Sequence, residues 1–158
     1  MGSKQIRLDE MVHSLKEAGC RLTPQRMAVL RVLVESEDHP SAEQIHEHVR
    51  ADFPMTSLAT IYKTLTLLKE MGEVQELSIG EGGSRYDGHS PDPHPHLVCT
   101  ACGRIDDVQV RALGDLPEEV ARKTGYRITG HRFDFFGICP RCQRRAAWEQ
   151  GKKEEDRV

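Results

Sequence analysis

The chain has 158 residues, a formal net charge of −3, and a composition that is 37% hydrophobic and 30% charged. This length suits one ordinary domain or two small ones. Its apolar runs are shorter than the roughly 18 residues of a membrane-spanning helix, and no charged-then-apolar signal peptide opens the chain. We therefore expect a cytoplasmic protein without a membrane partner, whose five cysteines serve metal or redox chemistry rather than disulfides.

Neither half of the chain is basic. Residues 1–86 contain 10 Lys and Arg against 13 Asp and Glu, and residues 87–158 contain 12 of each kind. Because DNA-binding domains often carry a basic excess, any contact with DNA must come from cations placed locally.

The first half predicts successive short helices. Apolar side chains recur with a near-helical period over residues 5–17. Thr23 suits the N-cap of a second helix, Ser41 opens a third, and Ser57 or Thr56 caps a fourth. Gly72 stands where the fourth helix would end in a left-handed residue.

The stretch VQELSIGEGGSRYD predicts two short strands around a glycine-rich turn. Helices followed by such a hairpin indicate a winged helix-turn-helix domain over residues 1–86, whose fourth helix would enter the major groove. Leu67 also falls on the outward face of that helix. The alternative to a winged helix domain is a plain helical bundle with a solvated face. The residues expected to contact DNA are Arg21, Ser57, Ala59, Thr60, Tyr62 and Lys63.

The second half predicts a small α/β domain over residues 87–148, so the whole chain is of the α+β class. DLPEEVARKTG is helix-like, and YRITGHRFDFFGIC alternates like a strand. We expect the charged residues 149–158 to form a disordered tail.

Two Cys-x-x-Cys pairs indicate a four-cysteine zinc site. Each pair lies beside a turn residue, so that both sulfurs can face one tetrahedral ion, and four thiolates leave no open position. The 36 intervening residues mean that a folded domain must bring the pairs together. The alternative is unbound pairs or one thioredoxin-type redox pair, but the βαβ context of the latter is missing. The four residues are Cys99, Cys102, Cys139 and Cys142.

A second site is indicated by PHPHLVC. If this stretch is extended, His94 and His96 share one face and Cys99 points the other way, which favours two sites rather than one. Possible further ligands are His39, Asp87, Asp106 and Asp107. Imidazoles with carboxylates suit Fe(II), Mn(II), Zn(II), Co(II) or Ni(II), although a histidine taken alone is usually an ordinary surface residue.

Residues 7–147 resemble the ferric uptake regulator (Fur) superfamily. The matching motifs are RLTPQR, HPSAEQIH, SLATIYKTL, RYD, HPHLVCTACG and CPRC. The resemblance implies a homodimeric, metal-dependent transcriptional repressor that is not an enzyme, with a DNA-binding winged helix domain and a C-terminal dimerisation domain. It also implies structural Zn(II) on the four cysteines and a regulatory metal, Fe(II) or Mn(II), between the domains. The regulatory ligands it implies are His39, Asp87, His94, His96 and Asp107.

Aspartates at positions 87 and 107 make the chain most similar to the peroxide-sensing PerR branch, because iron-sensing members usually have glutamate there. This similarity implies that peroxide reacting at Fe(II) oxidises His39 or His94 and releases the metal and then the DNA. An AT-rich palindromic operator is expected. Alternatives are a repressor that senses iron, manganese or zinc availability, a zinc-stapled protein-interaction module, and a metalloenzyme in which His94, His96 and Asp107 activate water.

Overall fold

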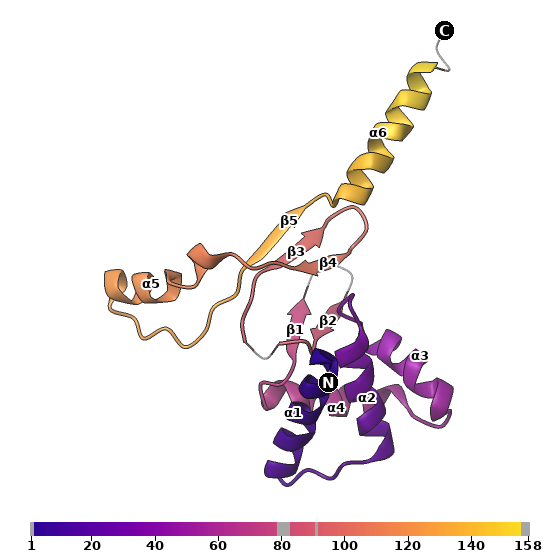
Figure 1. Cartoon of the computed structure of the whole chain (residues 1–158), viewed down its shortest axis with the longest axis vertical. Coiled ribbons are helices and arrows are strands. Elements are labelled where there is room, and N and C mark those ends of the chain that lie inside the picture. Colours follow the sequence, from indigo (N-terminus) through magenta and orange to yellow (C-terminus); the bar gives the residue numbers. More distant parts are fainter. Residues whose placement is uncertain (1, 79–82, 91, 156–158) are drawn as a thin grey trace. The chain divides into compact units, whose positions relative to one another are not determined.

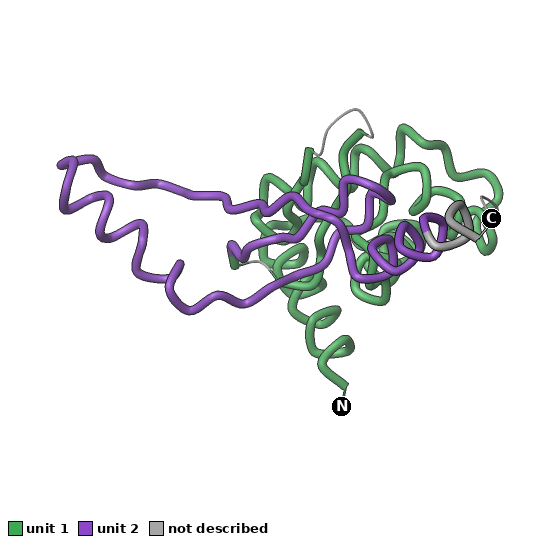
Figure 2. The backbone as a smooth tube through the Cα atoms, turned by 90° about the horizontal axis from the view of Figure 1, so that it is seen from above, with its two compact units in different colours: residues 1–92 green, residues 93–158 purple. Residues whose placement is uncertain are grey.

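The computed structural model describes residues 2–78, 83–90 and 92–155 (Figure 1). The chain divides into two compact units, Met1–Asp92 and Pro93–Val158 (Figure 2). This boundary lies after the predicted one at residue 86, because Asp87 still pairs with Gln75 in the hairpin of the first unit. No helix among the described residues is long and apolar enough to cross a membrane.

Unit 1 begins with the expected series of helices. These are α1 (Ser3–Glu17), α2 (Pro24–Glu35), α3 (Ala42–Asp52) and α4 (Leu58–Glu70). The predicted caps are present: the Thr23 hydroxyl accepts from Arg26 N at 3.2 Å, and Ser57 Oγ accepts from Thr60 N at the same distance. Ser41 and Gln44 form a full capping box, so that local sequence fixes where α3 starts.

The core of unit 1 lies between these helices. Its fully buried side chains include Leu30, Leu33, Ile45, Ile61 and Leu65, which come from α2, α3 and α4. Leu67 packs against this core while partly exposed, which accounts for an apolar residue on the predicted outward face of α4. α4 ends at Glu70, and Gly72 just beyond it has the expected left-handed conformation, with a φ of +73°.

The hairpin of unit 1 consists of β1 (Gln75–Ser78) and β2 (Ser84–Asp87), paired antiparallel with Gln75 opposite Asp87. The predicted glycine-rich turn between the strands falls mainly outside the described residues. An isolated bridge between Ser41 and Arg85 joins β2 to the residue that caps α3. The end of the hairpin is therefore fixed against the start of α3.

Unit 2 contains a three-stranded sheet in the order β4-β3-β5, together with helices that lie outside the sheet (Figure 1). β3 (His96–Cys99) pairs antiparallel with β4 (Ile105–Asp107) and parallel with β5 (Asp134–Gly137). A 3₁₀ turn, η2 (Arg111–Leu113), precedes α5 (Leu116–Thr124), and α6 (Pro140–Glu155) follows β5. The mixed helix and sheet content confirms the predicted α+β class.

Two predictions for unit 2 were wrong. The strand expected over 126–139 is present only as Asp134–Gly137, because pairing with β3 starts where the carbonyl of Phe133 accepts from His96 N at 3.1 Å. Residues 149–155 belong to α6 rather than to a disordered tail, and residues 156–158 of the predicted tail lie outside the described residues. Once a helix has started, each further residue adds a backbone bond, and the Arg145–Glu149 pair at 3.2 Å supports this extension.

Candidate metal centres and the exposed face of α4

In unit 1, His39 and Asp87 lie together although 48 positions apart in the sequence. His39 Nε2 is 3.8 Å from Asp87 Oδ2. His39 has a φ of 47°, in the left-handed region that non-glycine residues rarely adopt. Two contacts hold His39 in this conformation. Tyr86 N donates to the Pro40 carbonyl at 3.0 Å, and the Arg85 side chain donates to the His39 carbonyl.

The Asp87 carboxylate is oriented by the residues that follow it. Its Oδ1 accepts from His89 N at 2.8 Å, and the imidazole of His89 bonds the Ser36 carbonyl. The Gly88 carbonyl accepts from Arg7 Nε of α1 at 3.0 Å. Oδ2 is therefore the Asp87 oxygen that faces His39.

In unit 2, His94, His96 and Asp107 converge. The two imidazole centroids are 4.6 Å apart. Asp107 Oδ1 lies 3.3 Å from His94 Nε2 and 3.7 Å from His96 Nε2. The cause is the sheet register, since His96 and Asp107 are direct partners across β3 and β4 and must share a face. Two nitrogens and one oxygen then point at a common centre, as metal coordination requires. Asp106, the other candidate, instead pairs with Arg104 at 2.7 Å.

The four predicted cysteines also converge, all within unit 2. Cys99 ends β3, and Cys102 lies in the turn that follows. Cys139 precedes α6, and Cys142 lies in its first turn. Each offers a sulfur within 4.8 Å of the others. The parallel pairing of Cys99 with Gly137 brings the two pairs together, which confirms that the folded domain unites them.

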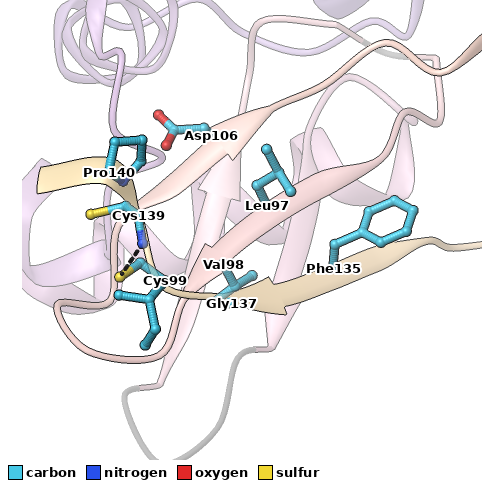
Figure 3. Close-up of a pocket in the computed structure, with 9 residues that line it drawn as sticks. Leu97, Val98, Cys99, Asp106, Phe135, Gly137, Cys139 and Pro140 are labelled. Carbon is cyan, nitrogen blue, oxygen red and sulfur yellow. Dashed lines mark hydrogen bonds between the residues drawn. The ribbon is translucent and has the colours of Figure 1, made fainter. Parts of the chain in front are cut away.

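The sulfur geometry fits zinc. Sulfurs bound to tetrahedral zinc at roughly 2.3 Å lie about 3.8 Å apart. Cys102 Sγ and Cys139 Sγ are 3.9 Å apart. Figure 3 shows the Cys139 N–H beside Cys99 Sγ, a contact of 3.3 Å, on one wall of a cavity of about 140 Å³.

The electrostatics of the sulfur site also suit a cation. The N–H of Cys139 donates to Cys99 and, against some burial, lowers the pKa of that thiol to about 6. The adjacent sulfurs of Cys139 and Cys102 raise the pKa of Cys142 to about 12. Four thiolates this close together repel one another, and a divalent cation offsets that repulsion.

The face of α4 expected to contact DNA is exposed at Ala59, Thr60, Tyr62 and Lys63. Ser57 caps the helix, and Arg21 is exposed ahead of α2. The Tyr62 hydroxyl donates to Glu43 Oε1 of α3 at 3.0 Å. That bond raises the pKa of Tyr62.

Sequence reasoning missed two residues that support these sites. Arg7 anchors the segment after Asp87, and Asp134 of β5 lies 3.6 Å from His96 Nδ1. An arginine in an amphipathic helix gives no signal of such a role. Asp134 could have been found only from the register of β5 with β3.

Unit 1 combines helices with a paired hairpin. Unit 2 groups four thiols and places two imidazoles beside a carboxylate. Together these features define the class of metal-responsive transcription regulators. The sequence profile of the Ferric uptake regulator family matches residues 17–136, and the chain belongs to that family.

Individual relatives agree with this assignment. The peroxide-responsive repressor PerR of Staphylococcus aureus is 40% identical over 136 residues, which cover 86% of this chain and 91% of that protein. The ferric uptake regulator Fur of Helicobacter pylori aligns with a TM-score of 0.73 at 27% identity, covering 89% of this chain and 93% of the other. The Campylobacter jejuni peroxide stress regulator aligns with a TM-score of 0.68 at 31% identity, covering 83% and 98%.

Proposed function

We propose that this chain is a homodimeric, metal-dependent repressor that binds an AT-rich palindromic operator and releases it when hydrogen peroxide oxidises a ligand histidine. The observation that carries the proposal is the placing of Asp107 Oδ1 against the Nε2 atoms of both His94 and His96. These donors are distinct from the sulfurs at the other end of β3. One group can thus maintain the fold while the other responds to a signal.

DNA contact is assigned to α4 and the residues around it. Ala59 and Thr60 are short enough for close approach to thymine methyl groups, and Lys63 supplies a cation for phosphate. Ser57, Tyr62 and Arg21 extend the same surface. Because unit 1 has no basic excess, replacing Lys63 with alanine should weaken operator binding and reduce its dependence on salt by about one phosphate contact.

Structural zinc is assigned to Cys99, Cys102, Cys139 and Cys142, which have the spacing and electrostatics of a closed four-thiolate site. This site links the end of β3 to the start of α6. The exposed apolar side chains of unit 2, among them Phe136 and Trp148, are consistent with a dimerisation role for this unit.

The regulatory metal, Fe(II) or Mn(II), is assigned to His39, Asp87, His94, His96 and Asp107. The first two belong to unit 1 and the other three to unit 2. A metal held by all five would favour one arrangement of the two units over others. The shift toward a DNA-competent dimer can be no larger than the metal's differential affinity for that arrangement.

Peroxide sensing is supported by the aspartates at positions 87 and 107 and by the 40% identity to a peroxide-responsive repressor. Bound Fe(II) would supply the electrons that activate hydrogen peroxide. His39 and His94 are the proposed sites of oxidation. In the net change the imidazole carbon gains one oxygen atom from peroxide, and water is released. An oxidised ring is a poorer ligand, so the metal leaves and the DNA follows.

The test uses zinc-replete protein loaded anaerobically with Fe(II) and bound to a palindromic duplex, to which a few equivalents of peroxide are added. Loss of DNA together with an added oxygen on the peptides containing His39 or His94 is expected. The control carries Zn(II) in the regulatory site, because that ion has no redox chemistry, and should keep its DNA. DNA loss without oxidised histidine would contradict the proposal.

Sensing of iron or manganese availability is the second candidate. The structural similarity to a ferric uptake regulator, with a TM-score of 0.73, is consistent with this candidate. It predicts that peroxide leaves both histidines unmodified while removal of the metal by a chelator releases the DNA.

A further inference from the structure

Three side chains of unit 2 form a row across its sheet. His96 of β3 is the direct partner of Asp107 in β4 and of Asp134 in β5. Because direct partners in a sheet share a face, the order along this face is carboxylate, imidazole, carboxylate. The other face at this level carries Leu97 and Phe135, which pair in the same register (Figure 3).

The two nitrogens of His96 face different carboxylates. Nε2 is 3.7 Å from Asp107 Oδ1, the oxygen that also faces His94. Nδ1 is 3.6 Å from Asp134 Oδ1. This second separation is about 0.6 Å longer than an ordinary N–H···O bond, a gap that a small side-chain rotation closes.

Asp134 is itself held in place. Its second oxygen, Oδ2, lies 2.6 Å from Arg132 Nε. Arg132 lies two residues before Asp134, just ahead of the start of β5. The ion pair leaves Oδ1 directed at His96.

We propose that Asp134 is a positioning residue for the regulatory metal site. Its Oδ1 accepts the Nδ1 proton of His96, which fixes the tautomer whose Nε2 lone pair faces the metal and orients the ring. This inference rests on the proposed function of His96 as a ligand. Asp134 does not bind the same ion, because the two ring nitrogens point in divergent directions.

The first test measures Mn(II) affinity of the zinc-replete full-length chain by counting unbound Mn(II) with electron paramagnetic resonance. Asp134→Ala should weaken Mn(II) binding about 10- to 100-fold, the usual effect of losing such a partner. Asp134→Asn keeps an acceptor oxygen without the charge and should fall between the wild type and the alanine variant. The matched control is Asp106→Ala, which removes an aspartate from the opposite face, where it pairs with Arg104.

The second test reads the His96 tautomer directly by long-range ¹H–¹⁵N correlation in protein that holds zinc but no regulatory metal. The wild type should show the proton on Nδ1, and Asp134→Ala should lose this preference. Zinc content and circular dichroism establish that each variant is folded. A purely structural role for Asp134 would not change the tautomer.

The outcomes separate this inference from the function on which it rests. If His96→Ala binds Mn(II) like the wild type, the proposed regulatory site is wrong. If His96→Ala loses Mn(II) but Asp134→Ala behaves like Asp106→Ala, only the role of Asp134 is refuted. Equal losses in the alanine and asparagine variants with an unchanged tautomer would make Asp134 a direct ligand and also overturn the inference.

Discussion

Arg7 joins α1 to the segments that surround the Asp87 carboxylate, and its replacement tests how unit 1 is held together. Arg7 Nε donates to the Gly88 carbonyl at 3.0 Å, and a terminal nitrogen donates to the Glu73 carbonyl at 2.7 Å. The other terminal nitrogen lies 2.8 Å from Glu73 Oε2. Arg7→Met keeps much of the side-chain volume while it removes every one of these donors.

The expected loss follows from burial. The Arg7 side chain is 9% exposed and that of Glu73 is 12% exposed. Breaking a buried pair by removing one partner costs about 3–5 kcal/mol, because the remaining charge stays desolvated. Residual solvent access places this case near 3 kcal/mol. For a unit of this size, about 4–8 °C per kcal/mol gives a fall of at least roughly 12 °C in the midpoint of unit 1.

The assay is thermal unfolding of the zinc-replete chain by circular dichroism, which reports mainly the helices of unit 1. Lys4→Met is the matched control on the same helix. Lys4 pairs with Glu37 at 3.6 Å, but the two side chains are 50% and 81% exposed, so the change should cost under about 1 kcal/mol. If Arg7→Met unfolds within 1 kcal/mol of Lys4→Met, the buried network does not hold α1 to the hairpin.

Three further changes test other parts of the molecule. A Cβ at Gly88 would lie 2.9 Å from Leu33 Cβ, so Gly88→Ala should destabilise unit 1 by about 1–3 kcal/mol in urea unfolding. The control is Gly130→Ala, which should be near neutral because a Cβ there meets nothing within 4 Å. Burial raises the pKa of Tyr86 to about 12. The folded state holds that proton more tightly than the unfolded chain, so stability should fall as pH rises from about 10 toward 12, and Tyr86→Phe should flatten this decline in pH-dependent melts. Cys102→Ser should abolish tight zinc retention, measured by metal analysis after dialysis, and unfold unit 2 while the helices of unit 1 persist.

Local signals in the sequence were sufficient for the helices of unit 1. Thr23, Ser41 and Ser57 each cap the helix they were expected to cap, because a capping side chain bonds only to the next few backbone amides. The alternation of residues 126–133 wrongly indicated a strand, because strand formation depends on a distant partner rather than on neighbouring residues. A strand exists only where a partner supplies hydrogen bonds, and the identity of that partner is not encoded locally.

In the candidate sites, too, some features are local in the sequence and others depend on strand pairing. The cysteine pairs and the His-x-His stretch are short spacings that the sequence displays directly. Asp107 is a different case, since its place beside His96 depends on how β4 pairs with β3. Asp134 depends on a parallel pairing between strands that α5 separates in the sequence, so no spacing rule could reveal it.

Each unit holds the side chains proposed as regulatory ligands through contacts of its own. His39 is held by backbone and Arg85 contacts, and His96 and Asp107 are held by sheet register. The entropy of ordering these donors is therefore largely lost during folding, and little of it remains to be lost on binding. More of the metal's binding free energy is then available to favour one arrangement of the units. If the operator requires that same arrangement, thermodynamic reciprocity demands that operator and metal raise each other's affinity by the same factor. A change that loosens a proposed ligand, at Arg7 or at Asp134, is then expected to lower that factor even where it leaves the proposed DNA-binding face of α4 untouched.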